Sequence, residues 1–330
     1  MEIYIFACCL FTVVFLAAVK LYQVSIKKPY ISNVKLHGKT AIVTGANTGL
    51  GFWTALDLAK RGAHVILACR NLQKAEEARK KILEALEDGG DVVVRHLDLS
   101  SMRSVRQFAR ETYEQEARLD ILINNAAVSG LPATITEENL EYTYATNYVG
   151  PFHLTNLLLD LLKKSAPSRI VNLTSIMNTL AHVDCDDIQA KKGFHPYDAY
   201  KNSKLMNILF TKELARRLEG TGVATCCIHP GVAATDIFRC IWGSSILTAF
   251  LGLFFKTAKD GAQTTVYAAV SEEMRDAKGV YLSDSQVCDK TRWINKEAYD
   301  EGLCKKLWET TEAILASIDS TTLSEKENKI

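Results

Sequence analysis

The stretch TAIVTGANTGLG, residues 40–51, decides the fold of this chain. Thr40–Val43 is a short apolar run of the kind that forms a buried strand. Glycines follow at once, and Phe52–Arg61 then has the composition of a helix. Glycines let a backbone turn tightly and approach a phosphate, and the free N–H groups at a helix N-terminus attract an anion. The predicted pyrophosphate-binding residues are Gly45, Asn47, Thr48, Gly49, Leu50 and Gly51.

Strands and helical stretches alternate along the following residues. Further short apolar runs predict strands at His64–Cys69, Val92–Leu97, Ile121–Asn124, Arg169–Thr174 and Val223–Ile228. Helical composition lies between them at Lys74–Leu86, Ser104–Glu116, Glu137–Lys163 and Ala199–Glu219. This alternation predicts one α/β domain over residues 38–316, a doubly wound Rossmann-type parallel sheet covered by helices on both faces. Such a sheet binds its ligand at the carboxyl ends of the strands.

The composition is that of a globular core and disfavours several classes of function. Of 330 residues, 48% are hydrophobic and 23% charged, and 39 Lys and Arg against 38 Asp and Glu leave a net charge of +1. Nucleic-acid binding usually needs a basic surplus, and disorder needs low hydrophobicity, so neither is expected. The nine cysteines are scattered without zinc-type CxxC spacing. They predict reduced thiols, no disulfide framework and no metal site.

Residues 1–28 are predicted to be a signal anchor. The run Ile3–Val19 carries no charge. As a helix it would extend roughly 26 Å, just short of the roughly 30 Å hydrocarbon core of a bilayer. Lys20, Lys27 and Lys28 follow the run, so the positive-inside rule places the rest of the chain in the cytosol.

Other interpretations of this segment stay open. A cleaved signal peptide would need a basic start, which Met1–Glu2 does not provide. A core helix is disfavoured because the strand–turn–helix unit starts afresh at residue 38. An anchor identifies no organelle, so we take the endoplasmic reticulum as the default, with the lipid droplet and the mitochondrial membrane as alternatives. Residues 317–330 are polar and are predicted to be a frayed tail.

The end of the second strand selects the dinucleotide. An acidic residue there would bind the ribose 2′-OH of NAD. Cys69 is instead followed by Arg70, whose planar guanidinium suits a phosphate. We therefore predict NADP(H), with Arg70 on the 2′-phosphate; the alternative is a solvated surface arginine.

A tyrosine and a lysine form the candidate acid/base pair. Tyr200 and Lys204 lie four residues apart, so on a helix they share a face. The pKa of a tyrosine is ordinarily about 10, and a fixed ammonium nearby lowers it by favouring the phenolate. Tyr197 and Lys201 have the same spacing and form a rival pair. Ser175, at the end of a strand, can donate a hydrogen bond that polarises a substrate carbonyl.

These residues and several others resemble the short-chain dehydrogenase/reductase family. The glycine spacing GxxxGxG, the Tyr-x-x-Ser-Lys pattern at 200–204, Asn-Asn-Ala at 124–126 and Pro-Gly-x-x-x-Thr at 230–235 carry the resemblance. The tyrosine pattern favours Tyr200 over Tyr197, which lacks a matching serine.

The resemblance implies roles for further residues. Asp98 contacts the adenine, and Asn124 and Ala126 lie along the cofactor, as do Tyr200 and Lys204. Asn147 links the lysine to water for proton relay. The loop residues Pro230, Gly231 and Thr235 cradle the nicotinamide carboxamide. Ala127 stands where the family usually has glycine, so its Cβ is expected to crowd the cofactor.

A narrower resemblance points to the membrane-anchored, NADP-dependent retinol dehydrogenases. The wide separation of Ser175 and Tyr200, the anchor, Leu97–Ser100 and residues 256–264 (KTAKDGAQT) carry it. It implies a substrate such as retinol, retinal or another lipid aldehyde.

The uncharged run Ile241–Phe255 is expected to be an apolar lid over this substrate, with its outer face on the bilayer; a core helix is the alternative. We therefore expect a membrane-anchored NADP(H)-dependent oxidoreductase that interconverts a lipophilic alcohol and its carbonyl, and that forms homo-oligomers as family members often do. The alternatives are a steroid or 3-ketoacyl reductase of the same fold, and a nucleotide-binding membrane scaffold with little turnover.

Overall fold

The computed structural model describes residues 2–26, 29–86, 89–189, 193–231, 256–288 and 293–327. Within these ranges one sheet has the strand order β3-β2-β1-β4-β5-β6-β7-β8. Its strands are β1 (Thr40–Thr44), β2 (His64–Cys69), β3 (Val92–His96), β4 (Ile121–Asn124), β5 (Ser168–Leu173), β6 (Val223–His229), β7 (Lys278–Ser283) and β8 (Gln286–Val287). All neighbours are parallel except β7 and β8. The predicted Rossmann-type parallel sheet is confirmed, and the structure adds β7 and β8.

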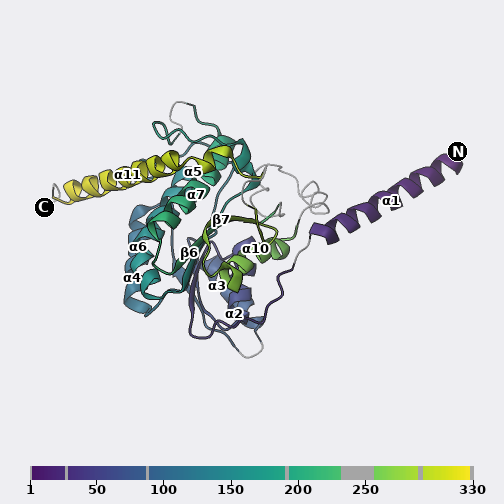
Figure 1. Cartoon of the computed structure of the whole chain (residues 1–330), viewed down its shortest axis with the longest axis horizontal. Coiled ribbons are helices and arrows are strands. Elements are labelled where there is room, and N and C mark those ends of the chain that lie inside the picture. The colour runs from purple at the N-terminus through teal and green to yellow at the C-terminus, as the bar shows by residue number, and fades with distance from the viewer. Residues whose placement is uncertain are drawn as a thin grey trace.

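Helices cover both faces of the sheet (Figure 1). One layer contains α2 (Gly49–Lys60), α3 (Leu72–Glu84) and α10 (Ala258–Val270); the other contains α4 (Met102–Gln115), α6 (Gly150–Lys164), α7 (Pro196–Arg217) and α11 (Glu301–Glu327). Each layer closes its own apolar core. Ile42 belongs to one core and its neighbours Ala41 and Val43 to the other, because successive strand residues point to opposite faces.

The strand order reverses at β1, which creates the ligand crevice. β1 pairs with β2 on one side and with β4 on the other. The loops after β1 and β4 therefore diverge at the carboxyl edge. The Thr44 hydroxyl fastens the bases of these loops together, since it accepts hydrogen bonds from the backbone N–H of Asn125 at 2.9 Å and of Ala126 at 3.0 Å.

The long helix predicted over Glu137–Lys163 is interrupted. A single turn, α5 (Tyr142–Tyr144), leads into the π-helix η1 (Ala145–Val149) and then into α6. Pro151 has no N–H to donate to the carbonyl four residues earlier, which disfavours regular α-helix at this point. Gly150 also packs against the loop that follows β3. A Cβ atom added at position 150 would lie 2.2 Å from the Leu99 carbonyl oxygen. Short helices of 3-10 type complete the structure at η2 (Ile176–Leu180), η4 (Glu272–Met274) and η5 (Lys296–Tyr299).

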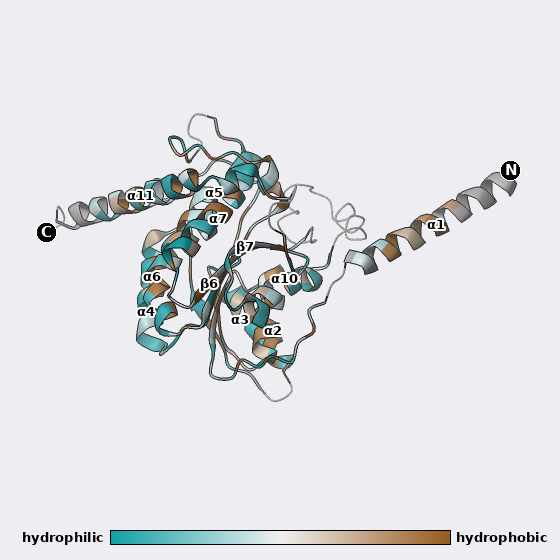
Figure 2. Ribbon diagram, viewed as in Figure 1, coloured by the Kyte–Doolittle hydropathy of each residue, from teal (hydrophilic) through white to brown (hydrophobic). Residues whose placement is uncertain are grey.

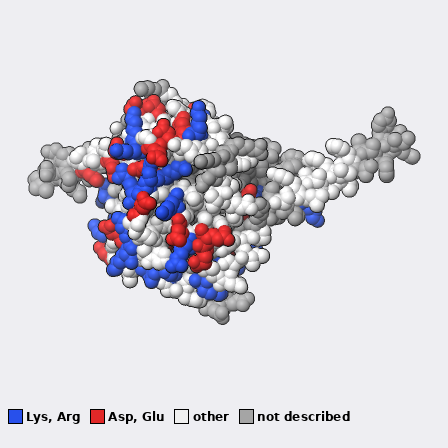
Figure 3. All heavy atoms as spheres, in the orientation of Figure 1, with Lys and Arg blue, Asp and Glu red and all other residues white. Residues whose placement is uncertain are grey.

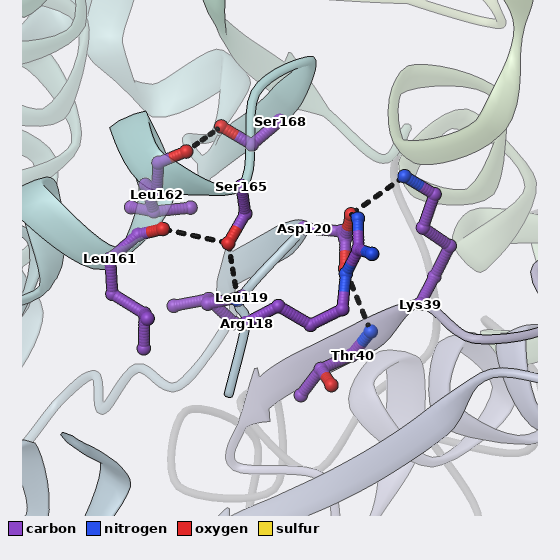
Figure 4. A network of polar contacts seen from close by, with 9 residues as sticks. All are labelled: Lys39, Thr40, Arg118, Leu119, Asp120, Leu161, Leu162, Ser165 and Ser168. Carbon is purple, nitrogen blue, oxygen red and sulfur yellow. Dashed lines mark hydrogen bonds and ion pairs between the residues drawn. The ribbon is translucent and has the colours of Figure 1, made fainter. Parts of the chain in front are cut away.

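A buried carboxylate ties the amino edge of the sheet together (Figure 4). Asp120 is 3% exposed and accepts hydrogen bonds from Lys39 Nζ at 2.8 Å, Arg118 Nη2 at 2.6 Å and the Thr40 N–H at 3.0 Å. Burial alone would raise the pKa of this carboxyl, but the hydrogen bonds from Arg118 and Lys39 outweigh it and lower the pKa. This network lies at the end of the strands opposite to the crevice.

The C-terminal helix α11 contradicts the predicted frayed tail. It continues to Glu327, past the boundary at residue 316. Trp308 packs 4.7 Å from the Phe152 ring and 5.7 Å from the Phe210 ring, measured between centroids. Beyond residue 316, Ile318 is buried and Asp319 pairs with Arg106 at 2.6 Å. These contacts on α4, α6 and α7 hold the helix where sequence polarity suggested none.

The N-terminal helix α1 (Glu2–Ile26) projects away from the sheet (Figures 1 and 2). Its apolar side chains Phe11, Val13, Val14 and Leu16 are exposed. Within the described part of the chain, no helix is both long enough and apolar enough to cross a membrane. On the face shown in Figure 3, cationic and anionic side chains are interspersed.

The predicted lid at 241–255 and the predicted loop residue Thr235 lie outside the described residues.

Candidate active site

A cleft of about 470 Å³ opens at the carboxyl edge, and the glycine-rich turn forms one of its walls. Gly45 and Gly49 have φ angles of +64° and +58°, which side-chain-bearing residues rarely adopt. A Cβ on Gly51 would lie 2.5 Å from the Gly45 carbonyl oxygen. The Thr48 side chain does not cap α2, which leaves the first N–H groups of this helix free for an anion. Asn47 and Leu50 also line the cleft. The turn therefore fits the pyrophosphate of a dinucleotide.

Basic residues line the far end of the same cleft. Arg70 and Lys74 both line it, and the Arg70 guanidinium donates to the Tyr142 hydroxyl and lies 5.9 Å from the centre of that ring. Asp98 also lines the cleft, but its carboxylate already accepts from the Ser100 N–H at 2.9 Å and hydroxyl at 2.6 Å. The two cations therefore favour an anionic group of the ligand at this end of the cleft. Sequence reasoning missed Lys74, which lies in the first turn of α3, and Tyr142, which only the fold brings near.

The cysteine at this end is a structural residue. Cys69 is 2% exposed and lines the cleft beside the glycine-rich turn. Burial raises the pKa of its thiol to about 11, although hydrogen bonds from the backbone of Ala46 and Asn47 act in the opposite direction. A thiol in this state is a poor nucleophile. Its backbone contacts hold the end of β2 against the turn.

The two asparagines that end β4 have different environments. The Asn124 side chain is 5% exposed and donates to Thr155 Oγ1 at 2.9 Å and to Asn172 Oδ1 at 2.8 Å. It thus joins β4 to β5 and α6. Asn125, which sequence reasoning did not select, lines the cleft and donates to the Thr44 carbonyl oxygen at 2.7 Å. Ala126 and Ala127 line the cleft next to it.

Ser175, Tyr200 and Lys204 are brought together at the ends of β5 and α7. The Tyr200 side chain hydrogen-bonds that of Ser175, and Lys204 Nζ lies 5.6 Å from the centre of the Tyr200 ring. Lys204 is 3% exposed and donates to the Leu173 carbonyl oxygen at 3.3 Å. These three side chains combine a hydroxyl donor, a proton-transfer group and a cation in one place.

The acid–base properties of this group differ from the expectation. Burial raises the pKa of Tyr200 above its ordinary value, and the Ser175 hydrogen bond only partly opposes this effect. The predicted lowering of the Tyr200 pKa is therefore wrong for the chain as described here. Burial also lowers the pKa of Lys204 to about 8. Both shifts have the same origin, because a buried site disfavours the charged form of either group.

The rival pair is elsewhere. Tyr197 is 40% exposed, and Lys201 forms an ion pair with Asp198 at 2.9 Å. Both lie on the solvent side of the first turns of α7. The structure thus separates the two pairs that have the same spacing.

Asn147 connects the π-helix to both the cleft and α7. Its Oδ1 accepts from the Val128 N–H at 2.8 Å, and its Nδ2 donates to the Val128 carbonyl oxygen at 2.9 Å and to Ser203 Oγ at 3.1 Å. Ser203 in turn donates to the Tyr200 carbonyl oxygen at 2.7 Å. Because Val128 lines the cleft, Asn147 fixes the helix of Tyr200 relative to it. π-helical turns occur frequently at functional sites.

Two residues of the predicted nicotinamide loop are described. Pro230 is buried, and Gly231 has a φ angle of +81°, which favours glycine. Both directly follow β6, so they lie at the carboxyl edge of the sheet with the other site residues.

Comparisons with known proteins agree with this geometry. The family profile described as short chain dehydrogenase matches residues 39–243. Human Retinol dehydrogenase 14 is 43% identical over 296 residues, covering 85% of this chain and 87% of that protein. Human Retinol dehydrogenase 13 is 45% identical over 304 residues, covering 89% of each.

Solved structures show the same fold. An uncharacterized protein from Mycobacterium Paratuberculosis has a TM-score of 0.68 and 32% identity, covering 85% of this chain and 94% of that one. The Pseudomonas aeruginosa RhlG/NADP active-site complex has a TM-score of 0.61 and 26% identity, covering 75% and 95%. The profile and the retinol dehydrogenases together identify this chain as a member of the short chain dehydrogenase family, an oxidoreductase that acts on the alcohol group of a small molecule with a nicotinamide dinucleotide as cofactor.

Proposed function

We propose that this chain uses NADP(H) to interconvert a lipophilic alcohol and its carbonyl compound, with retinol and retinal as the first candidates. The observation that carries the proposal is the cluster of half-buried Ser175 and Tyr200 with buried Lys204, which lies at the same edge as the dinucleotide cleft. The retinol dehydrogenase relatives supply the substrate class.

The side chains have complementary roles in this reaction. When bound, the nicotinamide exchanges a hydride with the substrate carbon. The Ser175 hydroxyl holds the substrate oxygen, and the Tyr200 hydroxyl gives it a proton or takes one from it. The Lys204 ammonium stabilises the phenolate that remains after proton donation. Asn147 acts through Ser203 to position Tyr200, and links Lys204 to the water that takes part in the proton relay.

Tyr200 carries its proton at neutral pH, as a tyrosine ordinarily does. Carbonyl reduction starts from this state, because it requires a proton donor at the substrate oxygen. Oxidation of the alcohol would instead start from the phenolate. An NADPH-rich cytosol would push the reaction in the same direction.

NADP(H) is favoured over NAD(H) by the charge at the far end of the cleft. Arg70 and Lys74 offer two cations to the 2′-phosphate, while Asp98 is the one carboxylate among the described residues that line this cleft, and Ser100 engages its Oδ1. Arginine suits phosphate because its guanidinium donates two parallel hydrogen bonds. The related RhlG structure contains NADP.

We also propose that α1 associates with a membrane, with the domain in the cytosol. Exposed side chains such as Phe11, Val13 and Leu21 are costly in water and favourable in lipid. The endoplasmic reticulum stays the first candidate, with the lipid droplet and mitochondrial membrane as alternatives. In this proposal residues 241–255 form the apolar lid of the substrate site, and copies of the chain associate as homo-oligomers.

The test is an activity assay on the detergent-purified full chain with NADPH and all-trans-retinal. Loss of NADPH absorbance is compared with the Tyr200→Phe variant and with Tyr197→Phe as the matched control. We expect turnover that Tyr200→Phe reduces by about 10²-fold or more and that Tyr197→Phe preserves. A steroid and 3-ketoacyl panel identifies a reductase of other specificity, and NADPH binding without turnover on any carbonyl would establish the scaffold alternative.

A further inference from the structure

A buried lysine packs against the loop that follows β6. Lys256 is 5% exposed, although lysine is rarely buried. A Cβ built on Gly231 would lie 2.9 Å from Lys256 Cδ and 3.1 Å from Nζ. The lysine stem and its ammonium therefore occupy the space that any larger residue at position 231 would need.

The ammonium is fixed from the other side by an aspartate. Lys256 forms an ion pair with Asp284, which lies in the turn between β7 and β8. Asp284 and Ser285 have φ angles of 53° and 58°, so both adopt the left-handed conformation. The Ser285 N–H donates to Thr264 Oγ1 on α10 at 3.2 Å. The turn is thus held in place, and Lys256 bridges it to Gly231.

The neighbouring histidine does not compete for the aspartate. His229 is 8% exposed, and burial lowers the pKa of its imidazole to about 4. It is therefore neutral at physiological pH, and Lys256 supplies the charge that balances Asp284. An ion pair whose aspartate is 42% exposed adds little stability, so a gain in stability does not by itself account for a buried lysine here.

We propose that Lys256 is a positioning residue for hydride transfer: paired with Asp284, it holds the Pro230–Gly231 backbone, and through it the nicotinamide, in the reactive orientation. This inference rests on the proposed function and on the role that the family resemblance implies for the loop after β6, which is contact with the nicotinamide. The pyrophosphate and 2′-phosphate are held elsewhere, at the glycine-rich turn and Arg70. Loss of Lys256 should consequently disturb orientation much more than affinity.

The test compares Lys256→Met, which keeps most of the volume and removes the charge, with Lys278→Met. Lys278 is a suitable control because it belongs to an exposed ion pair with Glu219 at 3.7 Å. Three quantities are measured on the full chain: the Kd of NADPH by fluorescence titration, kcat with retinal, and the side-specificity of hydride transfer using NADPH deuterated on either face of C4.

For Lys256→Met we expect kcat to fall at least about tenfold, since small misplacements of reacting groups cost up to about 10²-fold. The Kd of NADPH should change by less than about threefold, side-specificity should be eroded, and Lys256→Arg should restore most of the rate. If Lys256→Met does not fold, Asp284→Asn serves as the second variant. It should show the same combination of a lower kcat and a nearly unchanged Kd of NADPH.

Two negative outcomes are distinguishable. If the unmodified chain binds NADPH and turns over, but the folded variants keep its kcat and side-specificity, the inference is wrong and the proposed function stands. If the unmodified chain fails to bind NADPH, the proposed function and the inference are both overturned.

Discussion

Lys204 and Asn207, one turn apart on α7, donate hydrogen bonds to the same acceptor, the carbonyl oxygen of Leu173. The distances are 3.3 Å from Lys204 Nζ and 3.1 Å from Asn207 Nδ2, and both side chains are buried. Leu173 ends β5, two residues before Ser175. The shared carbonyl therefore joins the helix that carries Tyr200 to the strand that carries Ser175.

Removal of the second donor should affect both stability and rate. We expect Asn207→Leu to lower the free energy of unfolding by about 1–3 kcal/mol, because it removes a buried hydrogen bond. It should also lower kcat, since α7 loses one attachment to β5. Urea unfolding and steady-state kinetics measure the two effects. Asn156→Leu is the control, as Asn156 makes a similar bond to the Phe152 carbonyl away from the site. Unchanged kcat in folded Asn207→Leu would limit Asn207 to a scaffold role.

The charge of Lys204 should control the alkaline limb of the pH profile. Burial lowers the pKa of this lysine to about 8, so the ammonium is present below that pH and is lost above it. We expect kcat/KM for NADPH, which reports ionisations of the free enzyme, to fall as the pH rises through about 8. Lys204→Arg keeps a cation at all these pH values and should lose this limb while retaining part of the rate. A flat profile up to pH 10 in the unmodified chain would contradict this role.

Arg70 should determine the choice between the two dinucleotides. We expect Arg70→Ala to raise the Kd of NADPH about 10- to 100-fold, the usual worth of hydrogen bonds to a charged group, and to leave the Kd of NADH nearly unchanged. Arg79→Ala is the matched control, because Arg79 lies on α3, the helix that begins just after Arg70, and pairs with Glu76 in solvent. If the Kd values of NADPH and NADH rose equally, Arg70 would contribute only a general electrostatic attraction and would not select the 2′-phosphate.

Asp120 should dominate the acid sensitivity of the fold. Its pKa is lower in the folded chain than in the unfolded chain, so its stabilising contribution is complete above the unfolded value of about 4. That contribution disappears as the pH falls through the lower, folded value. We expect Asp120→Asn to lower the free energy of unfolding by about 1–3 kcal/mol at neutral pH, since the partly exposed Lys39 and Arg118 lose charge-assisted hydrogen bonds to a buried acceptor.

Thermal unfolding between pH 3 and pH 7 tests whether the stabilising contribution of Asp120 is lost as the pH falls. The difference between the unmodified chain and Asp120→Asn should shrink towards pH 3. Asp160→Asn should change little at any pH, because its pairing with Lys163 is exposed. A difference that stays constant down to pH 3 would mean that ionisation of Asp120 is not its source.

The sequence predicts the first six strands well, because each is an apolar run bounded by glycine or polar residues. It does not predict β7, whose residues Lys278–Ser283 begin with a lysine and a glycine. It also misses α11, whose polar end is held by contacts with α4 that local pattern does not reveal. The break at Ala145–Val149 depends on packing around Gly150, which is likewise a tertiary property.

The site was predictable to the extent that motifs mark it. The serine within Tyr-x-x-Ser-Lys separates Tyr200 from Tyr197, and the exposure of Tyr197 agrees. Which of Asn124 and Asn125 faces the cleft depends on the pleat of β4 and could not be read from adjacent identical residues. The direction of the Tyr200 pKa shift depends on burial, which exists only in the folded chain.

The contact between Gly231 and Lys256 couples two positions that lie far apart in the sequence. A side chain added at position 231 would collide with the stem of Lys256, so a larger residue at the first position requires a shorter one at the second. The two positions should therefore change together in evolution. A sequence alignment of relatives can test this expectation, because glycine at the first position should accompany a long side chain at the second.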